Sequence, residues 1–467
     1  MLKRLISKLK KTPARPDDEA IIIPRKQHSI SRTNISENAL KVLYRLKKAG
    51  YEGYLVGGGV RDLLLGLSPK DFDVVTNATP EQVHRLFKNS RLIGRRFRLV
   101  HVTFGRDIIE VATFRAHHST AGDNEKLAKT SDSGMLLRDN VYGDIDEDAV
   151  RRDFSVNALY YDIKDFSIHS YAGGIDDIKL RRMRMIGDPE TRYREDPVRM
   201  LRAVRFAAKL DFTIEAKTAA PINELAPLLR DIPAARMFEE VLKLFMAGQA
   251  MQTYELMQKH NLFAQLFPQT QQCIEEDPFA KQFVEQALIN SDKRVAQGKT
   301  LTPAFIFSVM LWPPMLKQAQ RLEDEGCPHV PALHQAGSSV VTNQQARTAI
   351  PRRFITPMRE IWDLQRRLIR RQPRHIESVA GHPRFRAAYD FLLLREQAGE
   401  SLDQAGRWWT DYQKQNPISQ QQMTDGLRDG RGRGRGRGNG RTRDGEGRND
   451  RPRKRSSKPR HRQDRDS

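Results

Sequence analysis

The sequence of 467 residues carries a formal net charge of +22 and has a pI of about 10.0. A chain of this length is expected to form about two to four domains, and its positive field favours a polyanionic partner, either nucleic acid or an anionic membrane surface. The only cysteines, Cys273 and Cys327, exclude a disulfide framework and favour a reducing, cytoplasmic compartment. No apolar run reaches about eighteen residues, so no membrane-spanning helix is predicted.

The first 30 residues are predicted to form a basic leader. Apolar residues recur between lysines in residues 1–11, a spacing that fits a short amphipathic helix able to touch a membrane or RNA. A disordered leader before Pro13 and Pro16 is the favoured alternative. A peripheral contact with the inner face of the membrane stays open.

Residues 54–75 are the stretch around which the chemistry is predicted to gather. They indicate a short apolar strand, a triple-glycine turn at 57–59, a helix start, and a second strand carrying Asp71 and Asp73. Because side chains alternate along a strand, both carboxylates are expected to project from one face, where they suit Mg²⁺ or, alternatively, Mn²⁺. The glycines would let backbone N–H groups approach a polyphosphate beside the positive end of the helix. The pattern predicts a site where a nucleotide meets two metal ions.

The neighbouring elements predict a small mixed sheet with helices on one face. Helices are expected at 34–49 and 79–88, the second with an N-cap threonine, a proline at its first position and a capping-box glutamine. Strands are expected between residues 91 and 112. Glu110 alternates with apolar neighbours on the last strand, so it either faces solvent or points at the aspartate pair as a third acidic group.

Residues 116–147 are polar and predict a loop that is functional or disordered. Residues 148–161 then look helical and contain two arginines followed by Asp153 and Asn157. This cluster is either a salt-bridged surface or a holder of metal and phosphate. A short hairpin is expected at 163–169.

After the head, the periodicity predicts an all-α neck and body. A helix at 195–206 repeats arginine at every third position, and an arginine beside Asp196 can read the edge of a base as well as a phosphate. Further helices are expected at 215–229, 234–247, 250–265, 278–296, 301–312, 355–372 and 383–398. A basic surface is expected from Arg366, Arg367, Arg370 and Arg371.

The C-terminal segment, residues 416–467, is predicted to be a disordered RNA-binding tail. It alternates arginine and glycine from Gly430 to Gly438 and cannot bury enough apolar surface to offset its ordering entropy. Such tracts bind single-stranded nucleic acid through phosphate contacts and stacking. The predicted divisions of the whole chain are a leader at 1–30, a catalytic head at 31–187, a nucleotide- and RNA-binding neck at 188–255, an arginine-rich helical body at 256–415 and the tail.

A set of motifs follows in order over about residues 50–210. They are Gly57-Gly-Gly-Val-Arg-Asp62, Asp71-Phe-Asp73, Ile109-Glu-Val-Ala-Thr-Phe-Arg115, Arg151-Arg-Asp-Phe154 and Glu195-Asp-Pro-Val-Arg-Met-Leu-Arg202. Together they resemble the bacterial class II nucleotidyltransferases, the family of poly(A) polymerases and CCA-adding tRNA nucleotidyltransferases. The segments Gly187–Pro197 and Pro24–Arg32 and the basic C-terminal region favour the poly(A) polymerase branch.

The resemblance implies roles for individual residues. Asp71 and Asp73 would bind two Mg²⁺ ions, and Asp153 would be the third active-site carboxylate, with Glu110 kept from the strand geometry as the alternative. The implied nucleotide-binding set is Gly57, Gly58, Arg61, Asp62, Arg115, Arg152, Asn157, Asp196, Arg199 and Arg202. Residues 57–62 would hold triphosphate and sugar, Asp196 and Arg199 would read the base, and Arg152 and Arg202 would lie near the phosphates.

The resemblance also implies the reaction. The protein would add AMP from ATP to RNA 3′ ends without a template, release pyrophosphate and so promote RNA turnover. Its expected partners are ATP and RNA 3′ ends, it is expected to be a monomer, and docking of RNA-chaperone or RNA-degradation proteins stays open. The alternatives are a CCA-adding enzyme and a non-catalytic RNA-binding protein on a decayed nucleotidyltransferase.

Overall fold

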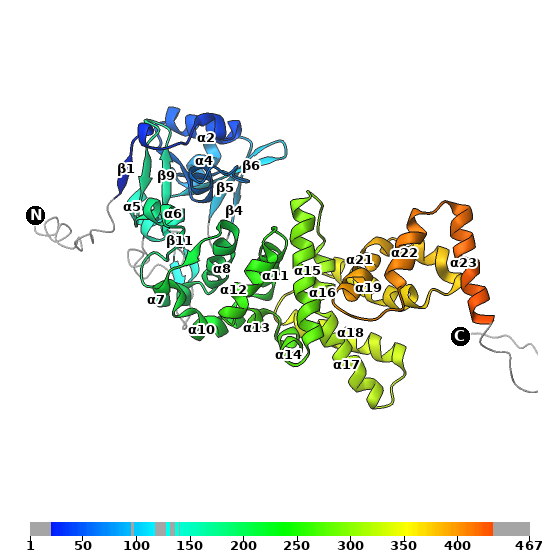
Figure 1. Ribbon diagram of the computed structural model, residues 1–467. Helices are drawn as coiled ribbons and strands as arrows, with labels where there is room; N and C mark the ends of the chain where they lie inside the picture. The colour runs from blue at the N-terminus through cyan, green and yellow to red at the C-terminus, as the bar shows by residue number, and fades with distance from the viewer. Residues whose placement is uncertain (1–19, 95–97, 117–127, 131–135, 140, 433–467) are drawn as a thin grey trace, which may run out of the picture.

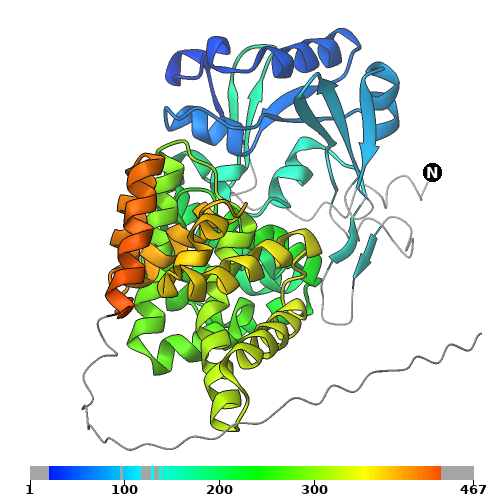
Figure 2. The same cartoon turned by 90° about the vertical axis from the view of Figure 1, so that its right-hand side faces the viewer.

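The computed structural model describes residues 20–94, 98–116, 128–130, 136–139 and 141–432. Figure 1 shows a mixed α/β head followed by a helical neck and body, and the turned view of Figure 2 shows the head standing over the helices. The predicted α+β class is therefore confirmed. The predictions for the first nineteen residues and for the arginine–glycine tract after residue 432 lie outside the described residues.

The head is built on an eight-stranded mixed sheet. Its spatial order is β1 (Ile21–Ile23), β10 (Ile168–Ser170), β9 (Leu159–Asp162), β2 (Gly53–Val56), β3 (Asp73–Thr76), β6 (Asp107–Thr113), β5 (Leu99–Phe104) and β4 (Ser90–Ile93). The pair β3 and β6 is parallel, and the other pairs are antiparallel. The β2–β3–β6 centre carries the predicted acidic residues to one edge of the head.

Two helices cover one face of this sheet. These are α2 (Glu37–Lys48) and α4 (Pro80–Leu86), and α4 begins with the predicted capping box between Thr79 and Gln82. The opposite face is also covered, because Tyr54, Phe114 and Tyr160 pack there with α5 (Ile145–Val150). The expectation of helices on one face alone is wrong, since a second apolar cluster needs its own cover.

Three local predictions in the head need correction. Strand β1, which falls inside the predicted leader at 1–30, belongs to the head, because it pairs with β10. The helix expected at 148–161 ends at Val150 and gives way to a 3₁₀ turn at Ser155–Asn157 and then to β9, where a fully buried Leu-Tyr-Tyr run favours strand pairing. The hairpin expected at 163–169 is the β9–β10 pair.

The predicted loop at 116–147 also contains structure. Its described parts include an antiparallel pair, β7 (Ala128–Thr130) with β8 (Leu136–Asp139).

The neck begins where the chain leaves the sheet. Its elements are α6 (Gly174–Lys179), β11 (Arg182–Met183), α7 (Pro189–Glu195), α8 (Val198–Leu210), β12 (Thr213–Ile214), α9 (Ala216–Ala219), α10 (Ile222–Leu225), η6 (Ala226–Asp231), α11 (Ala234–Phe245) and α12 (Ala250–Lys259). Helix α3 (Gly58–Leu64) of the head faces this neck through Arg61, which lies over the ring of Phe206 in α8.

The body continues the helical stack. Its elements are α13 (Phe263–Leu266), α14 (Pro268–Glu276), α15 (Pro278–Ala296), α16 (Pro303–Met310), α17 (Trp312–Asp324), α18 (His329–Gln345), α19 (Arg352–Arg370), η7 (Pro373–His375), α20 (Ile376–Ala380), α21 (Phe385–Gln397), α22 (Ala405–Lys414) and α23 (Pro417–Gly432). One apolar core extends from Phe154 to Ala398, so neck and body pack as a continuous unit across the predicted division at 255 and 256.

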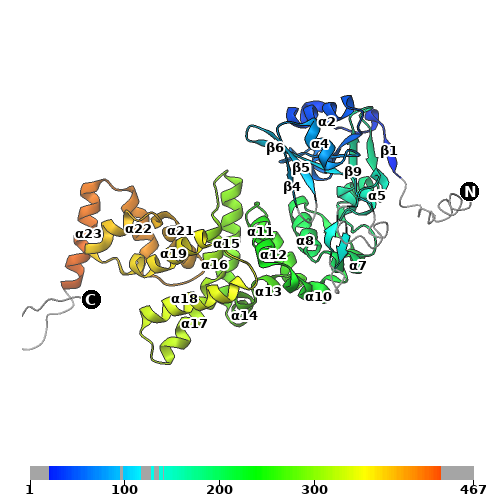
Figure 3. The same ribbon diagram turned by 180° about the vertical axis from the view of Figure 1, so that it is seen from behind.

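A second helical core lies at the far end of the body. It joins α19 to α22, and α23 adds Met423 and Leu427 to it (Figure 3). The predicted disordered tail therefore starts too early at 416, because α23 still has apolar side chains to bury. None of the helices in the described part of the chain is long and apolar enough to cross a membrane.

Candidate active site

A cavity of about 390 Å³ lies where the head sheet meets the neck. Strands β3 and β6 and the segment after α5 supply its head wall, and α7, α8 and α11 supply its neck wall. Its acidic residues are Asp73, Glu110, Asp148, Asp153, Asp196 and Glu240. Its basic residues are Arg115, Arg151, Arg152, Arg192, Arg199, Arg202 and Arg236.

The acidic edge of the cavity is set by strand register. Asp73 and Glu110 are partners on the parallel strands β3 and β6, so their side chains leave the same face of the sheet. The pKa of Asp73 is raised to about 6, chiefly by desolvation and then by the charges of Glu110 and Asp71, which outweigh the lowering effect of Arg152. Glu110 also contacts Nε2 of His101 at 3.2 Å. Glu110 thus lies beside Asp73 while its side chain stays 51% exposed. The two options open from the sequence do not exclude each other, and the role of Glu110 as a third acidic group stays a prediction.

Asp71 differs in position from the sequence prediction. It lies before β3, which begins at Asp73, and it is exposed and does not line the cavity. Its backbone carbonyl packs against Gly59, where an added Cβ would lie 3.5 Å from the carbonyl oxygen. Asp71 therefore acts on Asp73 through its charge rather than from the same strand.

The glycine turn links the acidic edge to the arginines. Gly57 has a φ of 71°, which favours glycine, and its N–H donates to the Leu159 carbonyl at 3.1 Å. A Cβ on Gly57 would lie 3.5 Å from Nη1 of Arg152 on the cavity wall. Gly57 and Gly58 adjoin the cavity without being part of its lining.

Arg61, Asp62 and Asn157 form a buried network behind the cavity. Arg61 is 2% exposed and donates to Asp62 Oδ1 at 2.6 and 2.9 Å and to Asn157 Oδ1 at 2.6 Å. Lys209 of α8 reaches Asp62 Oδ2 at 3.1 Å. None of the three buried residues lines the cavity. In the structure these residues join head to neck, and their implied contacts with triphosphate and sugar stay a prediction.

Asp153 has both carboxylate oxygens occupied. Its Oδ2 accepts from Arg202 at 2.6 Å, and its Oδ1 accepts from Asn157 at 3.1 Å and from the Phe154 N–H at 2.8 Å. Burial alone would raise the pKa of Asp153, but Arg202 and these donors hold it well below its usual range. Asp153 is therefore a fixed anion at the junction of head and neck.

Arg152 and Arg115 share an acidic partner, Asp148, which was not among the predicted site residues. Arg152 donates to Asp148 Oδ2 at 2.9 Å and to the Tyr160 hydroxyl at 2.7 Å, while the backbone N–H of Arg115 donates to Asp148 Oδ1 at 3.2 Å. Asp148 lies outside the motifs and was missed as a site residue, although its i,i+4 spacing to Arg152 is typical of ion pairs on helices.

The two residues predicted to read the base, Asp196 and Arg199, each pair with another side chain of the neck. Asp196 is joined to Arg236 of α11 at 2.9 Å, and Arg199 donates to Glu195 at 2.7 Å and to the Arg192 carbonyl. Both line the same cavity. Arg236 lies forty positions from Asp196, and no local pattern connects them, so sequence reasoning missed it.

Several arginines of the cavity lower one another's pKa. Burial, together with the charges of Arg115 and Arg192, lowers the pKa of Arg151 to about 9. Burial together with the charge of Arg199 lowers the pKa of Arg192 to about 10. Guanidinium groups that repel one another in a partly desolvated cavity gain from an anionic ligand. The cavity is therefore suited to phosphate groups.

The fit of a divalent metal rests on the acidic edge. Within the described residues no group of three or more His, Cys, Asp or Glu side chains is arranged to hold an ion by itself. The crowded Asp73, Glu110 and Asp71 carboxylates would nevertheless be relieved by a cation, and Mg²⁺ commonly needs only one or two protein carboxylates when phosphates complete its shell. The residues fit a metal bound together with a nucleotide.

Three family descriptions match the chain. Residues 53–184 match "Poly A polymerase head domain", residues 211–274 match "Probable RNA and SrmB- binding site of polymerase A" and residues 325–462 match "Polymerase A arginine-rich C-terminus". The chain is similar to "Poly(A) polymerase I" of Escherichia coli O6:H1, at 51% identity with 91% of this chain and 92% of that protein covered. It is likewise similar to the protein of that name from Salmonella typhimurium, at 50% identity with 92% and 93% covered.

CCA-adding enzymes are more distant relatives. The enzyme of Lactobacillus helveticus is 37% identical over 47% of this chain and 52% of its own length. The solved structure of the Thermotoga maritima CCA-adding enzyme complexed with tRNA is 19% identical, has a TM-score of 0.56 and covers 85% of this chain and 87% of its own, which shows a common fold.

The head domain, the cavity between head and neck and these similarities define a template-independent nucleotidyltransferase. Within that class, sequence identity of about half over more than nine-tenths of the chain decides which family the chain belongs to. The chain belongs to the poly(A) polymerase I family, and its activity is polyadenylation of RNA.

Proposed function

We propose that the protein transfers AMP from ATP to the 3′-hydroxyl of RNA in the cavity between head and neck, and that this cavity takes one nucleotide at a time. The observation that carries the proposal is the meeting of the Asp73–Glu110 edge with the arginine cluster in one space. In-line transfer forms a bond between the 3′-oxygen and the α-phosphate and breaks the bond to pyrophosphate, so a site needs carboxylates on one side and cationic donors on the other.

Asp73 and Asp71 are the proposed holders of Mg²⁺, with Mn²⁺ as a substitute. When bound, the metal would supply Lewis-acid stabilisation of the reacting oxygens. Glu110 lies beside Asp73 and is proposed to hold or accept the proton of the 3′-hydroxyl. Asp153 has its oxygens engaged by Arg202 and Asn157, so we assign it to positioning Arg202 rather than to direct metal contact.

The arginines are proposed to bind the triphosphate. Arg152, Arg151 and Arg115 line the head wall, and Arg192 and Arg202 line the neck wall, so a polyanion between them would be held from two sides. Gly57, which adjoins Arg152, and Gly58, which adjoins Arg61, would leave room for a phosphate beside the turn. Exclusion of water from the cavity would strengthen each of these contacts.

Asp196, held by Arg236, and Arg199 are proposed to satisfy the edge of adenine. Polar groups that would stay unpaired beside the wrong base reject it more strongly than an apolar pocket would. The RNA-binding match over the neck and the arginine–glycine tract outside the described residues are proposed to hold the primer. Because both cysteines are free thiols, we keep the cytoplasm as the proposed compartment.

A primer-extension assay with each nucleoside triphosphate tests the proposal. Long adenylate tails on generic RNA from ATP alone are expected, whereas addition limited to C, C and A on tRNA would favour the CCA-adding alternative. The double variant Asp71→Ala, Asp73→Ala should reduce turnover by at least about a hundredfold, on the order of 3 kcal/mol, while RNA binding is kept. Near-normal turnover of that variant would remove the assignment of the acidic edge.

A further inference from the structure

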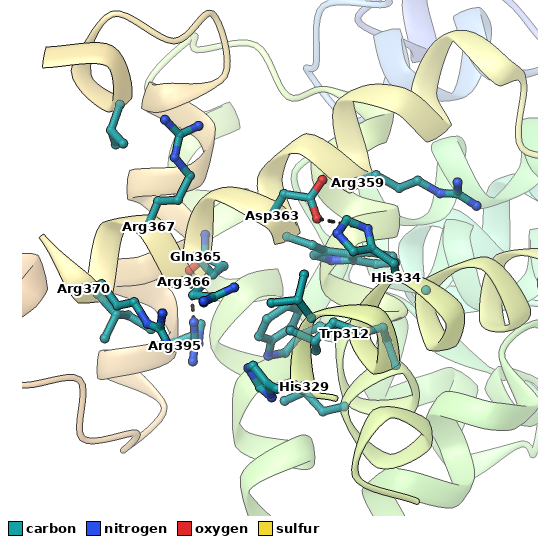
Figure 4. A pocket seen from close by; sticks show the side chains of 18 of the residues that line it. Trp312, His329, His334, Arg359, Asp363, Gln365, Arg366, Arg367, Arg370 and Arg395 are labelled. Atoms are coloured by element: carbon teal, nitrogen blue, oxygen red, sulfur yellow. Dashed lines mark hydrogen bonds and ion pairs between the residues drawn. The ribbon is translucent and has the colours of Figure 1, made fainter. Parts of the chain in front are cut away.

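A second cavity, of about 880 Å³, lies in the body and shares no lining residue with the candidate active site (Figure 4). Its walls come from the paired helices α17 and α18 on one side and from α19, η7 and α20 on the other. Helix α19 packs on α16 and α21, while α17 and α18 pack mainly on each other, so the two groups diverge and leave a hollow. Its size is in the range of sites that take one small ligand.

The inner wall of this cavity is apolar and aromatic. Trp312 and Trp362, which are 4% and 8% exposed, lie there with Leu333, Ile369 and Val379. The indole Nε1 of Trp362 donates to the Ser308 carbonyl at 3.0 Å. The Nε1 of Trp312 is buried and, within the described residues, has no hydrogen-bond partner.

The outer rim is cationic. Arg359, Arg366, Arg367 and Arg370 of α19 line the cavity. In Figure 4, Arg366 and Arg370 lie near Arg395, whereas Arg359 and Arg367 lie toward opposite sides of the view. Asp363 is the one carboxylate among the described lining residues, and it faces His334 at 3.8 Å. Arg395 lies deeper, over the ring of Trp312 at 4.9 Å, and its charge is matched by Glu400. The rim therefore presents an excess of positive charge around an aromatic interior.

We propose that this cavity is a subsite for single-stranded RNA, in which an unpaired base enters against the indole wall while its phosphates lie on the α19 arginines. A nucleotide combines a flat ring that carries acceptors with an adjacent anion, and this combination matches the interior and the rim together. An acidic peptide carries its charges and its apolar groups on separate side chains and matches the rim alone. The inference rests on the proposed function, because RNA is the substrate there, and it gives the body a contact upstream of the reacting 3′ end.

The test uses the full-length protein and two matched double variants. Arg366→Glu with Arg370→Glu reverses two charges of the rim. Arg352→Glu with Arg374→Glu makes the same change at exposed positions of α19 and η7 outside the cavity. Fluorescence anisotropy of a labelled oligoadenylate at fixed salt should show at least a tenfold rise in Kd for the rim variant and less than a threefold rise for the control. Thermal melts check that both variants are folded.

A second measurement separates base insertion from plain charge attraction. An abasic oligoribonucleotide of the same length should bind the wild-type protein about tenfold more weakly than oligoadenylate, a difference that shrinks to less than about threefold in the rim variant. Equal losses in both double variants would overturn the subsite in favour of a general positive field. Equal binding of abasic RNA, or displacement of RNA from the rim by a glutamate-rich peptide at lower concentration, would overturn it as well.

The outcome is separable from that of the proposed function. If the wild-type protein extends primers with ATP while the two double variants bind RNA alike, only the body subsite is lost. If the wild-type protein extends no RNA but oligoadenylate still depends on the rim, the subsite stands and the proposed reaction fails.

Discussion

The side chains of Asp73 and Glu110 lie on the same face of the sheet because the two residues are partners on the parallel strands β3 and β6. Desolvation and the neighbouring Glu110 charge raise the pKa of Asp73 to about 6. The fold therefore keeps two carboxylates close at a cost in stability, and it does so beside a cluster of arginines. A cost of this kind is expected where a cation and a phosphate chain are to be bound.

In the absence of divalent ions, Asp73→Asn is expected to stabilise the protein above about pH 6. A carboxyl group whose pKa is raised by folding binds more protons in the folded than in the unfolded chain between about pH 4 and pH 6, so wild-type stability falls as pH rises through this window. The gain in unfolding free energy at neutral pH should be about 1 kcal/mol. It is smaller than the pKa shift alone would give, because Asp73 is exposed and solvent screens its charge. Urea unfolding of both proteins across this range measures it, and a less stable variant at neutral pH would contradict the argument.

Addition of Mg²⁺ should reverse this order of stability. A ligand that binds only the folded state stabilises it by about 2.7 kcal/mol at a concentration one hundred times its Kd. The wild-type protein, with Asp73 available, should gain stability with MgCl₂, and Asp73→Asn should gain much less. Unfolding midpoints are compared with NaCl of equal ionic strength. Equal gains for both proteins would show that Asp73 does not hold the ion.

Replacement of Arg61 should act on stability rather than only on ATP binding. Arg61 is buried and joins Asp62 to Asn157, so Arg61→Ala leaves a buried carboxylate without its main partner and should cost about 3–5 kcal/mol. Lys209→Ala removes the exposed partner of Asp62 and should cost less than about 1 kcal/mol. Chemical denaturation measures both. An unchanged unfolding free energy with a raised KM for ATP would return Arg61 to the nucleotide site.

The buried position of Arg61 illustrates how much of the site could be predicted from the sequence alone. Signals that act over a few residues were sufficient for the capping box at Thr79, the β5–β6 hairpin and the strand, turn and helix around Gly57. The motifs also indicated most of the head residues that line the cavity, including Asp73 and Arg152. Whether a motif residue faces the cavity or the layer behind it depends on burial by distant helices, which no local pattern encodes.

The remaining misses have the same physical origin. Asp196 meets Arg236 only because α8 and α11 pack together, and the arginines of the body enclose a cavity only because α18 diverges from α19. Strand β9 forms in place of the expected helix because Tyr160 and Tyr161 are buried on opposite faces of the sheet, and this burial comes from tertiary packing. Pairings over forty or more residues are set by the three-dimensional packing.

Arg236 should govern which base is added, because it fixes Asp196. Its Nη2 donates to Asp196 at 2.9 Å, so Arg236 holds the Asp196 carboxylate in place on the cavity wall that both residues line. Arg236→Ala should lower the ratio of kcat/KM for ATP to that for CTP by at least about tenfold, or about 1.4 kcal/mol, and Arg236→Lys should recover it only in part, because lysine lacks the planar fork.

Single-nucleotide extension of a fixed primer measures this ratio directly. Arg230→Ala is the matched control, since Arg230 pairs with Gln265 and does not line the cavity, and its ratio should stay at the wild-type value. A uniform rise in KM for every nucleotide, with the ratio unchanged, would assign Arg236 to the phosphates instead. A drop confined to the ratio, with the unfolding midpoint preserved, requires that Arg236 and Asp196 contact the base as one unit, since a phosphate contact is the same for every nucleoside triphosphate.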